Sequence, residues 1–369
     1  MLKEIQISIK VLTPAFIGGW DNVNTSEFRV SSLKGLLRYW WRAFYSQNYN
    51  NYNQLLQEEN EIFGGQGLRS RISIRIIDKN ERISNLQNLQ NSPITHNLTG
   101  IRYLFFSMFP MGRSPGRNQF INPGSSYKLS VSSIDEKYLK EFLKALWALE
   151  NFGGIGARSR RGAGSIYVEN IEYINFNVGK NEIPKFLYEE RNNRAFNLQN
   201  FINENLSFAK KAENLPEFTK ISNEYFYYKI IDGNYRNWED ILNYIGKKLK
   251  DFRSYQRPPF NNEAIAIKNY LANRRYIGPN PITKTAFGLP IIYRFRNGRS
   301  TQVKPKNSEY PRRASPLFIK VGIKPNGNYY GIVSVIWSRF LPDNEMIALG
   351  DVNLNQPNIN TLIDFLNFL

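Results

Sequence analysis

The order of hydrophobic patterns in the first half constrains the possible folds of this chain most strongly. Strand-like patterns, either alternating or short and apolar, occur at residues 3–12, 71–77, 101–108, 126–132 and 166–171. Helical spacing of apolar side chains occurs at residues 30–44, 52–62 and 135–150. With insertions, this gives the order strand, helix, strand, strand, helix, strand, which is the order of a ferredoxin-like domain.

The second half alternates helices and strands in the same way. Strands are expected at residues 225–231, 290–296, 316–323 and 329–337, and helices at 237–252, 262–274 and 359–368. We therefore predict an α+β protein with two ferredoxin-like (RRM-like, βαββαβ) domains in tandem, with insertions. The N-terminal domain would span residues 1–175, a polar helical connection 176–219, and the C-terminal domain with helical insertions 220–369.

The chain is strongly basic, which points to a polyanionic partner. Its 369 residues include 49 Lys and Arg against 31 Asp and Glu, a net charge of +18, and 14% of them are aromatic. We expect a folded basic surface that binds nucleic acid, with an anionic membrane as the second choice. The sequence has no cysteine and no run of about 18 apolar residues. We therefore expect no disulfide, no membrane span, no metal and no cofactor, and a cytoplasmic location.

The segment 30–44 is predicted to form one helix with two faces. Its apolar face carries Leu33, Leu36, Leu37, Trp40 and Phe44. Its basic face carries Lys34, Arg38 and Arg42, each four residues after the last. This row either is a solvated face or binds phosphates, and Ser32 is the expected N-cap. Trp41 lies at the border, where it could pack under the arginine stems, stack on a base or seal a domain interface.

A loop of five glycines and three arginines joins the predicted helix at 135–150 to the next strand, over residues 151–165. Glycines let backbone N–H groups approach a ligand closely, and arginines bring forked donors that suit phosphate. The loop follows a helix and precedes a strand, so it is neither a Walker loop nor a dinucleotide-binding turn. We predict phosphate-backbone binding, with an exposed glycine-rich turn as the alternative. The candidate residues are Gly154, Gly156, Arg158, Arg160 and Arg161.

Two weaker basic sites place arginine pairs beside aromatic residues. Arg312 and Arg313 follow Tyr310, and Arg274 and Arg275 precede Tyr276. Single-stranded nucleic acid uses cations for its backbone and aromatic rings for its bases. We count the four arginines as RNA-binding candidates, although solvated charge pairs would give the same pattern.

Catalytic signals are poor, so we predict no catalytic residue and no metal site. His96 is the only histidine and lies in a polar stretch, 79–98, that we expect to be a loop. Asp21 follows the first strand, where a turn residue is the plainer interpretation. Glu58, Glu59 and Glu61 are expected to form a solvated helix face.

Several motifs together resemble the RAMP proteins of the type III-B CRISPR Cmr effector complex, in particular the family of its first-numbered RAMP subunit. The resemblance begins with Thr13-Pro14-Ala15-Phe16-Ile17-Gly18-Gly19 and continues in the basic helix from Ser32 to Ala43. Four further stretches agree with it: residues 62–65, 153–165, 286–291 and 313–317. The basic helix and the glycine-arginine loop are fairly specific as a pair.

The resemblance implies two packed ferredoxin-like domains and a non-catalytic RNA-binding subunit near the end of the effector filament. Such a subunit would contact the 3′ part of the guide RNA and the paired target RNA, with other RAMP subunits as partners. We expect the isolated protein to be a monomer. In this family of complexes, target cleavage belongs to a different subunit that uses a loop aspartate. Asp21 lies in the corresponding region but in different surroundings, and His96 lies outside any matching motif.

Two other functions fit the same sequence. One is a RAMP endoribonuclease that processes guide RNA or cleaves target RNA with Asp21 or His96. The other is an interaction scaffold whose basic surface meets acidic proteins.

Overall fold

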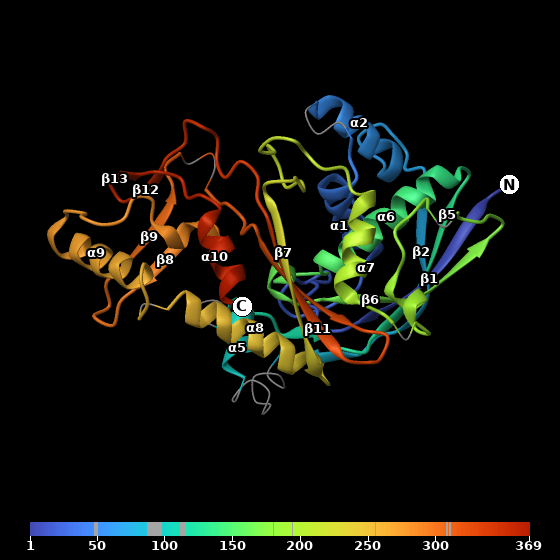
Figure 1. Cartoon of the computed structure of the whole chain (residues 1–369), viewed down its shortest axis with the longest axis horizontal. Coiled ribbons are helices and arrows are strands. Elements are labelled where there is room, and N and C mark those ends of the chain that lie inside the picture. The colour runs from blue at the N-terminus through green and yellow to red at the C-terminus, as the bar shows by residue number, and fades with distance from the viewer. Residues whose placement is uncertain are drawn as a thin grey trace.

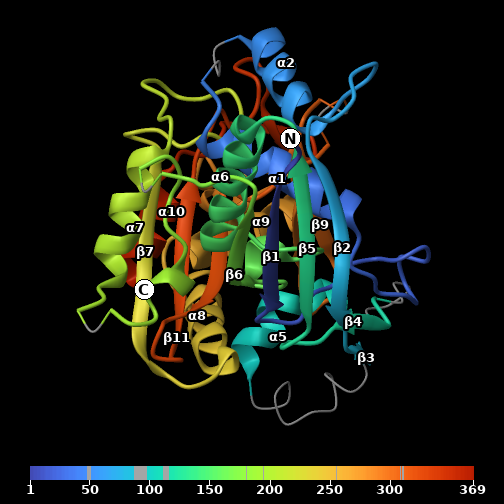
Figure 2. The same cartoon turned by 90° about the vertical axis from the view of Figure 1, so that its right-hand side faces the viewer.

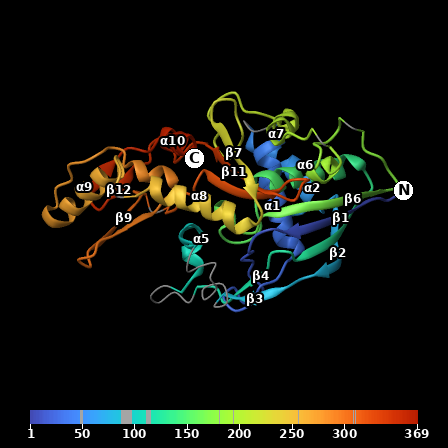
Figure 3. The same cartoon turned by 60° about the horizontal axis from the view of Figure 1, so that its bottom comes forward.

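The structure is a computed structural model that describes residues 1–47, 51–86, 98–110, 116–179, 181–193, 195–254, 256–307, 309 and 311–369. The chain is elongated. Its N-terminus and first sheet lie at one end, and the helix α9 (Phe260–Asn273) lies at the other (Figures 1 and 3). The C-terminal helix, α10 (Asn360–Phe368), packs near the middle of the molecule (Figure 1).

The first sheet has the topology that the sequence predicts for the first half. It consists of β1 (Lys3–Val11), β2 (Ser73–Asn80), β5 (Ser126–Ser133) and β6 (Ile166–Ile174). The strands lie in the order β2-β5-β1-β6 and every pair is antiparallel (Figure 2). The helices α1 (Val30–Phe44) and α6 (Glu136–Phe152) are the two crossovers. This is the strand order of a ferredoxin-like unit.

The second sheet contains three strands. They are β7 (Phe226–Tyr235), β10 (Leu317–Ile323) and β11 (Tyr329–Ile336), all antiparallel, in the order β10-β11-β7. Helix α8 (Trp238–Phe252) follows β7. Within the described ranges no fourth strand joins this sheet. An α+β chain with antiparallel sheets is therefore confirmed, whereas a second complete ferredoxin-like unit is not.

A smaller sheet is inserted into the second half, beside α9 (Figure 1). It consists of β8 (Ile291–Arg294), β9 (Ser300–Pro305), β12 (Ile347–Leu349) and β13 (Val352–Leu354), in the order β13-β12-β9-β8. Two short strands, β3 (Ile83–Asn85) and β4 (Gln119–Ile121), pair below the first sheet. Five of these six strands were not predicted, because short strands give too few residues for a clear alternation.

Both faces of the second sheet are buried, which places α1 and α6 between the two sheets. Phe318 of β10 contacts Trp40 of α1, with ring centroids 5.4 Å apart. The next residue, Ile319, points the other way and packs in the core that contains Leu242 of α8. Successive side chains of a strand alternate between faces, so β10 serves both cores. Trp40 therefore faces the core, as predicted.

The strand predicted at 101–108 is wrong. Residues Thr99–Phe105 form helix α5, and Phe106–Met108 form a short 3-10 turn, η1. The Gly100 amide donates to Asn243 Oδ1 of α8 at 2.9 Å, and a Cβ at Gly100 would lie 2.1 Å from the Asn243 carbonyl. Close packing on α8 thus overrides an aromatic, β-favouring sequence.

The connection 176–219 is more deeply packed than its polar composition suggests. It contains one short α-helix, α7 (Leu198–Asn205), and two 3-10 turns. Phe186, Phe201 and Ile202 belong to the same core as α1 and α6. The connection is therefore part of the first core rather than a loose linker.

Candidate nucleic-acid interface

The glycine-arginine loop (residues 151–165) forms the joint between the two halves of the molecule. Arg160 Nη1 donates to the carbonyl of Ser315 at 2.6 Å, and Arg161 Nη1 donates to the carbonyl of Leu317 at 2.9 Å. The amide of Val321, in strand β10, donates to Ser165 Oγ at 3.1 Å. Side chains of the loop therefore take the place that a neighbouring strand would have along the edge of β10.

Backbone crowding explains two of the glycines. The Ile155 amide donates to the Gly164 carbonyl at 2.8 Å, and a Cβ at Gly154 would lie 2.7 Å from the Ala163 carbonyl. Gly156 has φ +81°, a conformation that side chains other than glycine rarely adopt. The fold thus requires these glycines, and phosphate contact by Gly154 and Gly156 stays a prediction.

A cavity of about 450 Å³ opens beside the loop. Its lining residues include no carboxylate and are Phe106, Arg158, Ser159, Arg160, Arg161, Phe287, Gly288, Leu289, Pro290, Ile291, Arg313 and Ser315. We call it the arginine cavity. It brings together the loop and Arg313, two basic sites that lie about 150 residues apart in the sequence. It lies where the first half, the second sheet and the small inserted sheet meet.

Hydrogen bonds to neutral partners fix the arginines of the cavity. Arg158 donates from Nε and Nη2 to the Leu104 carbonyl, the first of these at 2.7 Å, and Arg313 Nη2 donates to Ser338 Oγ at 2.7 Å. Among the described residues, none of the four lining arginines has an ion pair, and the buried Nε of Arg313 has no hydrogen-bond partner. Donor groups thus remain for an anion that the protein itself does not supply.

The charges of these arginines act on one another. Burial, and then the charges of Arg158 and Arg253, lower the pKa of Arg161 to about 9. Burial also lowers the pKa of Arg158 to about 10, and that of Arg313, where the charge of Arg160 adds to the effect. Cations held together without a counter-ion favour the binding of an anion, because it relieves their repulsion.

Two residues of this site were missed in the sequence. Phe106 falls within the predicted strand 101–108, and nothing in that pattern indicates an exposed ring at a cavity. Arg253 ends α8, and its guanidinium lies over the ring of Phe287 at 4.7 Å. Nothing local in the sequence marks either residue, because only the packing of α5 and α8 brings them to the loop.

A smaller cavity of about 270 Å³ lies at the start of α1. Gly156 and Ala157 of the loop line it together with Ser32 and Leu36 of α1. The loop and the start of α1 therefore lie close together. The predicted N-cap is wrong, because α1 begins at Val30 and Ser32 lies in its first turn.

The basic row of α1 is partly neutralised. Glu59 of α2 (Tyr52–Phe63) accepts from Arg38 Nη1 at 2.9 Å and from Arg42 Nη1 at 2.5 Å. Glu59 is only 2% exposed, so its assignment to a solvated face is wrong. In the described part of the chain Lys34 has no ion pair, and burial, with the nearby charge of Arg38, lowers its pKa. Of the row, Lys34 alone keeps an uncompensated charge.

Trp41 is a packing residue in this structure. It is 3% exposed, and its Nε1 donates to Glu141 Oε2 of α6 at 2.7 Å. Of the three possibilities for its ring, this burial favours sealing an interface over stacking on a base.

The remaining predicted arginines lie elsewhere. Arg274 ends α9 in a left-handed conformation with φ +56°, and Arg275 follows it, exposed. Arg312 is exposed beside Arg313 but does not line the arginine cavity. RNA contact by these three residues stays a prediction, and Tyr310 lies outside the described residues.

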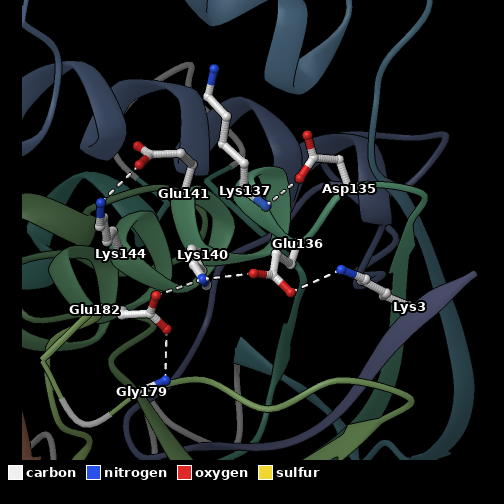
Figure 4. Close-up of polar contacts among 9 residues, drawn as sticks. All are labelled: Lys3, Asp135, Glu136, Lys137, Lys140, Glu141, Lys144, Gly179 and Glu182. Atoms are coloured by element: carbon white, nitrogen blue, oxygen red, sulfur yellow. Dashed lines mark hydrogen bonds and ion pairs between the residues drawn. The ribbon is translucent and has the colours of Figure 1, made fainter.

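Other surfaces carry balanced charge. On α6, Lys140 contacts Glu136 at 3.1 Å and Glu182 at 2.8 Å, and Lys3 also binds Glu136 at 2.8 Å (Figure 4).

On the open face of the first sheet, Ser8 lies opposite Lys128, which pairs with Glu172 at 3.7 Å. RRM domains stack bases on aromatic residues of this face. The side chains that β1 and β5 present there, between Glu4 and Lys10 and between Ser126 and Ser132, are all polar.

The structure shows no catalytic arrangement around Asp21, one of the two residues considered for an endoribonuclease. Asp21 accepts from the Val23 amide at 2.7 Å and from Asn24 Nδ2 at 2.6 Å, and the Asn24 hydrogen bond holds its pKa below the usual range. This is the arrangement of a turn residue. His96 lies outside the described residues. In the described ranges no helix is long and apolar enough to span a membrane, and no cluster of three or more His, Asp or Glu side chains could hold a metal ion.

Comparison with known proteins identifies the family. A sequence profile of the RAMP superfamily matches residues 8–167, from β1 through the glycine-arginine loop. The Cmr1-2 subunit of the CRISPR Cmr system of Pyrococcus furiosus is 31% identical over 179 residues, which are 45% of this chain and 95% of that relative. The chain belongs to the Cmr1 family of RAMP proteins. The Cmr1-1 subunit of the same organism is 26% identical over 328 residues, 86% of this chain and 82% of that relative.

Solved structures share the fold over the whole chain. The crystal structure of Cmr1 from Pyrococcus furiosus in its apo form matches with a TM-score of 0.54 and 20% identity, covering 100% of this chain and 96% of that one. A chain in a cryo-EM structure of the type III-B Cmr-beta complex, bound to cognate target RNA and AMPPnP, matches with a TM-score of 0.55 and 13% identity, covering 100% and 99%. At such low identities these likenesses show the fold alone.

Proposed function

We propose that this Cmr1-family chain is a non-catalytic, RNA-binding subunit of a type III-B CRISPR effector complex. The arginine cavity carries the proposal, because it holds four arginines and no carboxylate at the joint between the two halves. Family membership supports the complex, and the neighbour in a complex bound to target RNA supports RNA as the ligand. Guide RNA, target RNA and other RAMP subunits are the proposed partners.

The mechanism is contact with the phosphate backbone. Arg158, Arg160 and Arg313 offer forked donors to phosphate oxygens without reading bases, while base pairing between guide and target supplies the sequence. Each phosphate neutralised in single-stranded RNA releases counter-ions, so affinity falls steeply with salt. Contact with the 3′ part of the guide near the end of the filament is the position that we propose.

The test is RNA binding by the full chain at several salt concentrations. We expect Arg158→Gln with Arg313→Gln to weaken single-stranded RNA binding about equally for unrelated sequences and to lower the salt slope by about 1.4, roughly 0.7 for each lost contact. Lys140→Gln, on the ion-paired face of α6, is the matched control and should bind like wild type. Circular dichroism checks that the glutamine double variant is folded. If it is unfolded, the double variant Arg158→Lys with Arg313→Lys is used instead, which keeps both charges but loses the forked donors.

Unchanged affinity and an unchanged salt slope in the folded double variant would refute RNA binding at the cavity. Cleavage of labelled RNA by the wild-type chain, abolished by Asp21→Ala or His96→Ala, would instead support the endoribonuclease.

A further inference from the structure

An exposed aromatic ring stands at the mouth of the arginine cavity. Phe106 is 47% exposed, although it lies in the first turn after a well-buried helix. Its neighbours Leu104 and Phe105 are fully buried against α8, so the backbone at Phe106 has a fixed position. A single exposed ring is common on protein surfaces, and this one matters because it lies beside the arginines of the cavity.

Phe106 is tied to the arginines. The guanidinium of Arg158 lies over its ring at 5.2 Å, and the Arg158 side chain is anchored on the Leu104 carbonyl two residues earlier. The same structural unit therefore fixes a cation and an aromatic face next to each other. A nucleotide presents the two complementary groups, a phosphate and a flat base.

The walls of the cavity suit such a ligand in size and polarity. Its volume of about 450 Å³ lies within the range of pockets for small ligands and is enough for one nucleotide. Besides the arginines, the lining includes the apolar residues Phe287, Leu289, Pro290 and Ile291. A purely electrostatic surface for an RNA backbone would not need apolar residues in the lining.

We propose that the arginine cavity is a single-nucleotide site, in which Arg158, Arg160 and Arg313 hold one phosphate of single-stranded RNA and Phe106 stacks on the adjoining base. The proposal rests on the proposed RNA-binding function and adds to it a fixed point where one nucleotide leaves the strand. Stacking on a phenyl ring tolerates any base, so the site needs no particular sequence. The ligand class is a nucleoside monophosphate unit.

The test measures the affinities of several small ligands for the full chain by isothermal titration calorimetry and compares them with one another. We expect AMP and UMP to bind more tightly than either inorganic phosphate or adenosine, because only they fill both parts of the site. Phe106→Ala should weaken AMP binding roughly five- to hundred-fold, the range found for loss of one stacked base, and leave phosphate binding unchanged. Phe106→Tyr should restore it, and Tyr227→Ala, at an exposed tyrosine of β7, is the control.

The outcomes separate this proposal from the function on which it rests. If phosphate binds as tightly as AMP, or if Phe106→Ala binds AMP like wild type while single-stranded RNA still binds, the nucleotide site is refuted and the RNA-binding function stands. If the wild-type chain fails to bind single-stranded RNA, the proposed function itself is refuted.

Discussion

Arg161 donates a hydrogen bond from Nη1 to the carbonyl of Leu317 at 2.9 Å, across the joint between the two halves of the chain. Its side chain is 8% exposed and lies beside Arg158 and Arg160, which face the arginine cavity. The glycine-arginine loop therefore serves two purposes at once. Arg161 binds the second sheet to the first half, and its neighbours Arg158 and Arg160 line the arginine cavity.

We expect Arg161→Ala to destabilise the protein more than a surface substitution does. The Leu317 carbonyl would lose its partner inside the joint, which costs about 1–3 kcal/mol for a buried acceptor. Arg312→Ala, at an exposed position outside the cavity, should change the free energy of unfolding by less than about 0.5 kcal/mol. Urea unfolding followed by circular dichroism measures both. Equal stability of the two variants would contradict a structural role for Arg161.

The contact between α5 and α8 makes a second prediction about stability. A Cβ at Gly246 would lie 2.4 Å from the Gly100 carbonyl, so Gly246→Ala must push the helices apart and should cost about 1–3 kcal/mol. Gly35 lies in α1 with open space around it. Gly35→Ala should stabilise the chain by about 0.5–1 kcal/mol, because alanine favours the helix. Thermal unfolding of the two variants tests the opposite signs.

Periodicity predicted most of the regular structure because the long elements have one buried face. The alternation of Ile5, Ile7 and Ile9 identified β1, and the helical spacing around Leu33 and Trp40 identified α1. The strand prediction for residues 101–108 failed because Gly100 and its apolar neighbours pack on α8, which lies more than 130 residues later in the chain. No local pattern carries that information.

The sequence predicted which arginines belong to the candidate site, but it did not predict what those arginines contact. Counting charge located the arginines of the loop and Arg313, and the structure brings both to one cavity. The sequence could not show that Arg160 and Arg161 also bind the edge of β10, or that Glu59 would pair with the row on α1. Those facts depend on distances between elements that are far apart in the chain.

A buried pair across the joint predicts how stability depends on pH. Burial raises the pKa of Glu150 in α6 to about 8, although the Val168 amide and Lys320 favour its charged form. Burial lowers the pKa of Lys320 to about 7. A carboxyl whose pKa is raised on folding contributes stability below its unfolded pKa, about 4.5, and loses it as pH rises toward the folded value.

We therefore expect wild-type stability to fall between about pH 4.5 and 7, where Glu150 would be charged only in the unfolded chain. Glu150→Gln keeps an acceptor for the Val168 amide but cannot ionise. Relative to wild type, this variant should gain stability steadily as pH rises from 5 to 7, as urea unfolding at each pH would show. A stability difference that does not change with pH would contradict burial of Glu150 as an ionisable group.

Glu59 predicts the behaviour of the basic row on α1. Replacing it by glutamine removes the carboxylate that Arg38 and Arg42 share, so both cations become available to RNA. If the row contacts phosphates, Glu59→Gln should bind single-stranded RNA more tightly and steepen the salt slope by up to about 1.4, roughly 0.7 for each new contact. The variant should also lose stability, because Glu59 is buried and anchors α2.

The control is Glu136→Gln on α6, which raises the net charge equally. It removes the partner of Lys3 and leaves Lys140 paired with Glu182. A general effect of net charge would make both variants bind RNA more tightly by the same factor. Tighter binding by Glu59→Gln alone would place Arg38 and Arg42 at the RNA. If Glu59→Gln binds RNA with wild-type affinity, Arg38 and Arg42 do not contact the RNA, and their role is to hold α2 against α1.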